Sequence, residues 1–167
     1  MDILKGRVVY KLSDDINTDK ILAGRYLVLT GDKELAEHCF EGHIQDWNEK
    51  VKEGDILVGG DNFGCGSSRE SAPQAIKEVG VGCVVAKSFA RIFLRSAVNI
   101  GLTVLECEDA VDLVSPNDDL EIDFRRKSIT DLTTAKTMQY RDFPPFMQEI
   151  INAGGLVEYA KKRLAKS

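Results

Sequence analysis

Metal ligands are scarce in this sequence. Its 167 residues include only four cysteines and two histidines, and no Cys-x-x-Cys pair occurs among them. We therefore expect no metal site built from this chain alone. Free thiols are the usual state of such scattered cysteines in a reducing cytosol. The four lie far apart, at Cys39, Cys65, Cys83 and Cys107.

Long apolar runs and an excess of basic charge are also missing. No stretch of about 18 apolar residues is present, and residues 1–5 lack the apolar core of a signal peptide. The net charge of -5 argues against a wide nucleic-acid footprint. The sequence thus predicts a cytoplasmic protein that binds neither membrane nor nucleic acid. Its length and its 43% apolar content suit a single domain over residues 1–167.

Apolar strands alternate with amphipathic helices in the first two thirds of the chain. The order strand, helix, strand, helix, strand predicts right-handed crossovers and a partly parallel sheet, hence an α/β fold. Gly101 follows the second helix, as expected of a helix end. Strands are expected at 6–10, 55–59, 83–86 and 102–105, and helices at 72–79 and 89–100.

The other segments are less regular. Residues 120–124 alternate and predict a half-exposed strand, which 128–130 could pair with. Two C-terminal helices are expected, at 144–153 and 156–164, separated by Gly154-Gly155. Residues 13–19 indicate a polar turn, residues 24–32 a loop, and Asp32 a cap for a short helix reaching about Phe40.

A glycine-rich loop, residues 62–67, lies between an expected buried strand and helix. Backbone N–H groups and the positive end of the helix would face a ligand there. Two serines and Arg69 follow, and a guanidinium can bind two oxygens of a carboxylate or phosphate. The segment does not fit a P-loop, a dinucleotide fingerprint or a nucleophile elbow, because Arg69 and Glu70 occupy positions those motifs assign to other residues.

Structural roles for these residues remain open at this point. Residues 67–70, Ser-Ser-Arg-Glu, satisfy a capping box, which would make Ser67 a helix cap. Pro73 favours a helix that begins nearer Arg69 and leaves Ser67 in the loop. Arg69 could equally form a surface ion pair, and Cys65 could be a small loop residue.

Three motifs, in order along the chain, resemble the aconitase swivel-domain family. Residues 62–70 resemble its Gly-Ser-Ser-Arg-Glu signature, and residues 15–19, Asp-Ile-Asn-Thr-Asp, resemble its N-terminal Asn-Thr-Asp loop. Residues 87–93 together with 99–102 resemble its second conserved block. The resemblance covers roughly residues 6–155 and implies a single swivelling β/β/α domain.

The resemblance also implies roles for individual residues. The first serine of the signature, Ser67, would take the proton from the carbon next to a substrate carboxylate. Ser68 and Arg69 would help to bind the substrate. Asp19 would lie in the active site, although a plain turn aspartate is the alternative. Ser67 would have to react as an alkoxide, stabilised by loop amides and Arg69.

Dehydration of a hydroxy acid needs a base, an acid and a Lewis acid for the leaving hydroxyl. The chain offers a base and an anion clamp but no cluster ligands. The resemblance implies that a large-subunit partner carries a [4Fe-4S] cluster, whose open iron holds the substrate hydroxyl, and a histidine acid. This chain would then bind no cofactor itself and would be inactive alone.

Residues 24–30 bear on the substrate. Relatives that accept an extra carboxylate present arginine in this loop, in a pattern resembling Tyr-Leu-Arg-Thr, whereas residues 26–29 here are Tyr-Leu-Val-Leu. Val28 and Leu29 cannot pair with a carboxylate, but they would favour an isopropyl group. We therefore expect a hydro-lyase that isomerises 2- and 3-isopropylmalate in leucine biosynthesis.

Other functions remain open. Arg25 could turn into the site, or residues 24–30 could simply pack on the partner. Within the enzyme class, homoaconitase, 2,3-dimethylmalate dehydratase and a broad-range isomerase are alternatives. Outside the enzyme class, the glycine-rich loop could belong to a dicarboxylate-binding module that performs no chemistry. The negative net charge disfavours a role in RNA binding.

Overall fold

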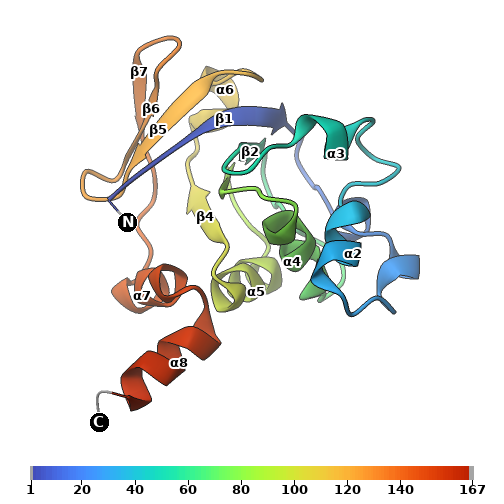
Figure 1. Ribbon diagram of the computed structural model, residues 1–167. Helices are drawn as coiled ribbons and strands as arrows, with labels where there is room; N and C mark the ends of the chain where they lie inside the picture. Colours follow the sequence, from blue (N-terminus) through green and yellow to red (C-terminus); the bar gives the residue numbers. More distant parts are fainter. Residues whose placement is uncertain (1, 166–167) are drawn as a thin grey trace.

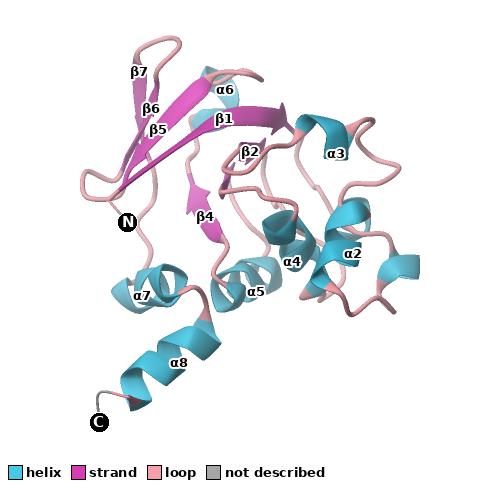
Figure 2. Ribbon diagram, in the orientation of Figure 1, coloured by secondary structure: helices cyan, strands magenta, loops and turns pink. Residues whose placement is uncertain are grey.

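The computed structural model describes residues 2–165, and its strands form one curled seven-stranded sheet in the order β4-β3-β2-β1-β5-β6-β7 (Figure 1). Figure 2 shows the helices gathered mainly on one side of it. The strands are β1 (Ile3–Lys11), β2 (Ile56–Gly59), β3 (Cys83–Ala86), β4 (Thr103–Glu106), β5 (Asp119–Asp123), β6 (Ser128–Asp131) and β7 (Lys136–Gln139). The helices are α1 (Thr18–Ile21), the 3-10 helix η1 (Gly24–Tyr26), α2 (Asp32–Glu37), α3 (Trp47–Lys50), α4 (Ser71–Glu78), α5 (Arg91–Ile100), α6 (Ala110–Leu113), α7 (Pro145–Ala153) and α8 (Leu156–Leu164).

The parallel half of the sheet consists of β1 to β4, with α4 and α5 as the connections between β2, β3 and β4. The strands β2 and β3 are buried along their whole length, as expected of parallel strands covered on both faces. Leu57 and Val84 face the core beneath the helices, whereas Val58 and Val85 belong to a second core on the other face. The predicted α/β fold with a partly parallel sheet is confirmed.

The antiparallel half of the sheet joins β1 to β5, β6 and β7. Ile122 and Ile129 pair across β5 and β6 as the sequence predicted, and both belong to the second core with Val58 and Val85. Two β layers therefore pack on each other, and the helices form a third layer. β7 was not predicted, because Met138 is the one buried residue among its four positions.

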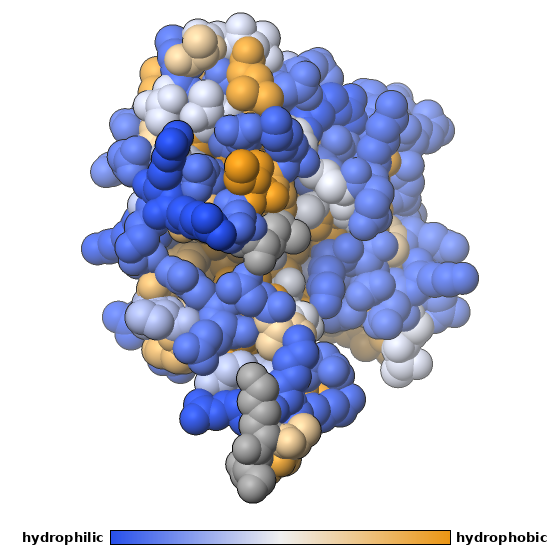
Figure 3. All heavy atoms as spheres, turned by 60° about the vertical axis from the view of Figure 1, so that its left-hand side comes forward, coloured by the Kyte–Doolittle hydropathy of each residue, from blue (hydrophilic) through white to orange (hydrophobic). Residues whose placement is uncertain are grey.

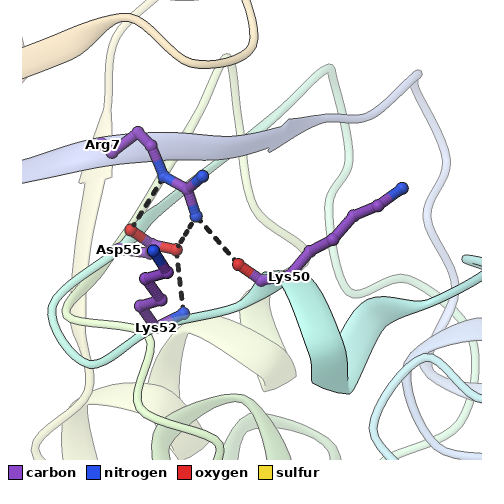
Figure 4. Close-up of polar contacts among 4 residues, drawn as sticks. All are labelled: Arg7, Lys50, Lys52 and Asp55. Carbon is purple, nitrogen blue, oxygen red and sulfur yellow. Dashed lines mark hydrogen bonds and ion pairs between the residues drawn. The ribbon is translucent and has the colours of Figure 1, made fainter.

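Strand β1 belongs to both halves. Residues 3–7 pair with β5, residues 8–11 pair with β2, and the register shifts between Val8 and Tyr10. Arg7 lies next to this change, and its Nη2 donates to Asp55 Oδ2 at 2.7 Å and to the Lys50 carbonyl at 2.9 Å (Figure 4). Asp55 also accepts from the Lys52 amide at 2.9 Å. These bonds fix β1 to the segment entering β2.

We expect Asp55→Ala to lower the free energy of unfolding by about 2–4 kcal/mol, because it leaves Arg7 charged and without its partner. The side chains of Asp55 and Arg7 are 6% and 31% exposed. Urea denaturation measures the change. The matched control is Lys5→Ala on the same strand, whose pair with Glu121 is more exposed and should contribute about 0.5 kcal/mol or less. Equal losses from both variants would contradict the structural role of the Arg7–Asp55 pair.

The C-terminal helices α7 and α8 pack on α5, and Figure 1 shows α8 at the lower end of the molecule. Gly101 ends α5 in the left-handed conformation, with φ 76°, as the sequence predicted. A side chain there would meet the backbone of Gly154 at 2.5 Å.

The space-filling view in Figure 3 shows a surface covered mostly by hydrophilic residues, with apolar ones in small groups. Within residues 2–165, no helix is long and apolar enough to cross a bilayer.

Some local predictions were wrong. Gly31 is the N-cap of α2 and provides no side-chain bond, whereas Asp32 is the first helical residue. Part of the loop expected at 24–32 forms the 3-10 helix η1. The helices α1, α3 and α6 were not predicted, because four residues are too few to display a helical apolar period.

Candidate active site

Three segments that follow parallel strands meet at one edge of the sheet. They are residues 14–19 after β1, residues 61–69 after β2, and residues 88–90 after β3. The Gly64 amide donates to the Ile16 carbonyl at 2.7 Å, and the Phe63 amide to the Ser88 carbonyl at 3.0 Å. The carboxyl ends of neighbouring parallel strands commonly form a ligand site. Segments from each of the three motifs that resemble one family thus lie together in space.

Polar side chains fix the base of the glycine-rich loop. Asn62 donates from Nδ2 to Asp15 Oδ1 at 2.8 Å, across 47 residues of sequence. The hydroxyl of Ser88 accepts from the Asn62 amide at 2.9 Å and donates to Asp61 Oδ1 at 3.0 Å. The Asp61 amide donates to Asp14 Oδ1 at 2.8 Å. Each segment is therefore bonded to the central loop through a side chain as well as through its backbone.

An aromatic cluster supports the loop from below. Phe63, Phe89 and Phe93 are buried, and their ring centroids lie 5.4–6.0 Å apart. Gly64 crosses this cluster with φ 79°, and a Cβ there would lie 2.1 Å from the Phe93 ring. Only glycine fits both the conformation and the space. The packed aromatic rings therefore fix the position of the loop residues that follow Gly64.

Ser67 lies in the loop and does not cap a helix. Helix α4 begins at Ser71 with Glu70 as N-cap, so the capping-box interpretation is wrong and the later helix start that Pro73 favoured is confirmed. The buried Thr18 holds the Ser67 segment: its amide donates to the Cys65 carbonyl at 2.8 Å and its hydroxyl to the Ser67 carbonyl at 3.1 Å. Ser67 and Ser68 are exposed.

Arg69 forms an ion pair with Asp19, so the structure brings together two residues that the sequence analysis had singled out separately. The Arg69 side chain is 15% exposed and that of Asp19 is 56% exposed. The same Nη1 atom lies 3.4 Å from the Leu22 carbonyl. The pair is thus partly buried at the junction of the Asn-Thr-Asp segment and the glycine-rich loop, rather than on an open surface.

The loop expected to contact the substrate begins beside Arg69. A Cβ on Gly24 would lie 3.6 Å from Arg69 Nη2. Farther along, Leu29 is partly buried against the core, whereas Val28 is 83% exposed. Arg25 does not turn towards Arg69: its guanidinium carbon lies 4.8 Å from the centroid of the Tyr26 ring. The structure therefore brings the start of this loop to the site and leaves Val28 open to solvent.

Metal ligands are not gathered anywhere in the described part of the chain. Within residues 2–165, no group of three or more His, Cys, Asp or Glu side chains is placed to hold an ion. All four cysteines are free thiols, and Cys39, Cys83 and Cys107 are buried. Burial raises the pKa of these three thiols. Cys65, in the glycine-rich loop, is partly exposed.

Several contacts of this site were not foreseen from the sequence. Thr18 lies within a motif, but nothing in the motif indicates that its hydroxyl reaches the Ser67 carbonyl. The Leu22 carbonyl and Gly24 approach Arg69 from outside any motif. Ser88 was part of a conserved-looking block, yet its role in holding Asn62 is visible only in the structure.

Comparison with known proteins identifies the family of this chain. The family model for the aconitase C-terminal domain matches residues 11–110. The 3-isopropylmalate dehydratase small subunit of Caldicellulosiruptor saccharolyticus is 52% identical over 164 residues, covering 98% of this chain and 94% of the relative. The 2,3-dimethylmalate dehydratase small subunit of Eubacterium barkeri is 51% identical over 151 residues, covering 90% and 93%.

A solved structure agrees with the fold over nearly the whole chain. The crystal structure of 3-isopropylmalate dehydratase (leuD) from Methanocaldococcus jannaschii superposes with a TM-score of 0.92 at 46% sequence identity. The match covers 98% of this chain and 96% of that one. With the three converging motifs, these comparisons show that the chain belongs to the aconitase C-terminal domain family, among the small subunits of its two-subunit hydro-lyases.

Proposed function

We propose that this chain is the small subunit of a hydro-lyase that isomerises 2-isopropylmalate and 3-isopropylmalate by dehydration and rehydration, in leucine biosynthesis. The observation that carries the proposal is the meeting of the three motif segments, with exposed Ser67 and Ser68 beside the Asp19–Arg69 pair. The proposal also draws on the relatives of matching length that are named as small subunits of this enzyme.

In this proposal Arg69 is the anion clamp. Its Nη1 is occupied by Asp19 and lies near the Leu22 carbonyl. Within the described residues, its Nε and Nη2 atoms have no acceptor, so they can donate to a substrate carboxylate. A guanidinium held on one side by a carboxylate keeps its orientation when the substrate leaves. Asp19 thus acts by positioning Arg69, and Ser68 adds a hydroxyl to the same anion site.

Ser67 is the proposed base. It would remove the proton from the carbon next to the bound carboxylate and return it in the reverse reaction. A serine hydroxyl is a very weak base, so its alkoxide has to be stabilised by loop N–H groups and by the positive charge of Arg69. The bonds from Thr18 to the Cys65 and Ser67 carbonyls keep the loop carrying that hydroxyl in place.

The remaining groups are assigned to a large subunit. Residues 2–165 offer no ligand set for a metal, so we assign the [4Fe-4S] cluster, which would serve as Lewis acid for the departing hydroxyl, to that partner. The exposure of Ser67, Ser68 and Asp19 in the isolated chain fits a site that another subunit covers. We place the assembled enzyme in the cytoplasm.

The choice of substrate depends on the loop at 24–30. Relatives named for isopropylmalate and for dimethylmalate are about equally similar to this chain, so overall identity does not separate these substrates. Val28 and Leu29 present apolar surface and no charge, which suits an isopropyl group and disfavours a third carboxylate. Burial of Val28 against the substrate or the partner would account for a valine that is 83% exposed in the isolated chain.

Co-expression with the neighbouring large-subunit gene, followed by anaerobic cluster reconstitution, tests the proposal. The complex is assayed against malate derivatives that carry isopropyl, dimethyl or carboxylate substituents. We expect the highest kcat/KM for 3-isopropylmalate. A complex that prefers homocitrate derivatives would contradict the proposed substrate. Dicarboxylate binding without turnover of any substrate would favour a non-catalytic binding module.

Arg69→Lys should raise KM at least tenfold, because a lysine cannot reproduce the planar two-point contact, and loss of one charge-assisted bond costs about 1.5–3 kcal/mol. Steady-state kinetics of the reconstituted complex measure this change in KM. Arg95→Lys, at an exposed position of helix α5 outside the three motifs, serves as the control and should leave KM within about twofold. An unchanged KM in Arg69→Lys would remove Arg69 from the anion site.

A further inference from the structure

The loop that carries Val28 has few attachments to the rest of the chain. Its own hydrogen bonds are local turns, from Tyr26 to Ala23, from Leu27 to Gly24 and from Leu29 to Tyr26. Leu27 is 44% exposed and Val28 is 83% exposed. The attachment to other elements therefore depends on the side chains of Tyr26 and Leu29, which pack against the core.

Tyr26 has a specific partner. Its ring stacks on the ring of His38, with centroids 3.8 Å apart and planes 8° from parallel. His38 Nδ1 lies 2.5 Å from Glu41 Oε2. Hydrogen bonding from the Tyr26 hydroxyl, and then from His38, holds the pKa of Glu41 below its ordinary range. Glu41 thus contacts His38 directly, and we call Tyr26, His38 and Glu41 the ring clamp.

The ring clamp connects the loop to the helix that follows the proposed catalytic residues. His38 is the C-cap of α2, whose Leu35 is buried. Helix α2 packs along α4, and Figure 1 shows the two side by side. Helix α4 begins two residues after Arg69. The other end of the loop, at Gly24, lies against Arg69 itself. Both ends of the loop that carries Val28 are therefore held in position relative to the Ser67–Arg69 segment.

We propose that His38 and Glu41 are positioning residues for substrate specificity, because the ring clamp fixes the loop that presents Val28 to the third substituent of the substrate. This inference rests on the proposed function. Neither residue touches the reacting atoms. Their effect should appear only for a substrate whose substituent reaches the loop, and not for malate itself, which has no such substituent.

The test compares kcat/KM for 3-isopropylmalate and for unsubstituted malate in the reconstituted complex. We expect His38→Ala to lower the ratio of kcat/KM for 3-isopropylmalate to kcat/KM for malate roughly three- to tenfold, mainly by raising KM for 3-isopropylmalate. Stacked ring pairs contribute binding or folding energy on that order. His38→Phe keeps a flat ring and should restore most of the ratio. His43→Ala is the matched control, because His43 contacts Phe40 rather than Tyr26, and the ratio should stay within about twofold.

Limited trypsin digestion provides a readout that needs no activity. Arg25 is exposed and immediately precedes Tyr26, so a loosened loop should be cut faster after Arg25. We expect His38→Ala, but neither His38→Phe nor His43→Ala, to accelerate this cleavage roughly three- to tenfold. Unchanged cleavage and an unchanged ratio in His38→Ala would overturn the inference. A wild-type complex inactive on 3-isopropylmalate would contradict the proposed function instead, while the cleavage rates would still test the clamp.

Discussion

Replacing Ser67 with alanine should reduce turnover by the reconstituted complex roughly 10²–10⁴-fold, the usual contribution of general-base catalysis. Substrate binding should change little, because Arg69 and Ser68 retain their places in the anion site. The fold should also be preserved, since Thr18 bonds the Ser67 carbonyl and not its hydroxyl. Steady-state kcat, substrate affinity and melting temperature together separate these effects.

Ser71→Ala is the matched control for this substitution. Ser71 is the first residue of α4 and lies beyond the glycine-rich loop, so alanine there should keep kcat within about twofold. Near-normal kcat in Ser67→Ala together with a lowered melting temperature would show that Ser67 only supports the loop. The base would then have to come from the large subunit.

Val28→Arg should shift the preference of the complex from 3-isopropylmalate towards homocitrate derivatives by at least about tenfold in relative kcat/KM. The substitution removes apolar surface, worth about 0.8 kcal/mol per buried methylene-sized group. It also supplies a charge-assisted bond of about 1.5–3 kcal/mol to a third carboxylate, and about 1.4 kcal/mol corresponds to a factor of ten. At 83% exposure Val28 can be changed without disturbing the core.

Leu27→Arg tests whether position, rather than added charge, causes the shift. Leu27 is also exposed, at 44%, and the same charge one residue earlier should move the ratio much less. The ratio is measured for both substrates in the two variants and the wild type. An unchanged ratio in Val28→Arg would mean that this loop does not reach the third substituent, and the assignment of isopropylmalate would lose its support in the sequence.

The central strands could be predicted because they are buried on both faces and therefore read as unbroken apolar runs. Residues 56–59 and 83–86 are examples, and Gly101 marked the end of α5 as expected. Strand β7 could not be predicted, because its own sequence is mostly exposed and polar. Its place in the sheet depends on the turn before it and on its pairing with β6. Asp32 satisfied the preferences of a cap, yet it is the first residue of α2 and Gly31 is the N-cap.

Only those residues of the candidate site that belong to a motif could be predicted from the sequence. Ser67, Ser68, Arg69 and Asp19 could be singled out by resemblance, but the Arg69–Asp19 pairing depends on contacts across 50 residues of sequence. The ring clamp could not be foreseen, because His38 and Glu41 belong to no motif and Tyr26 read only as part of an apolar stretch. Tertiary packing, rather than local pattern, brings these side chains together.

Titration of a fixed amount of cluster-loaded large subunit with this chain, assayed anaerobically with 3-isopropylmalate, tests the central claim most directly. We predict no turnover from either subunit alone, turnover that rises to a plateau as this chain is added, and a lower plateau when Ser67→Ala chain competes with wild type for the same large subunit. Full turnover by the large subunit alone, or an equal plateau with Ser67→Ala, would contradict the claim that this chain completes the active site.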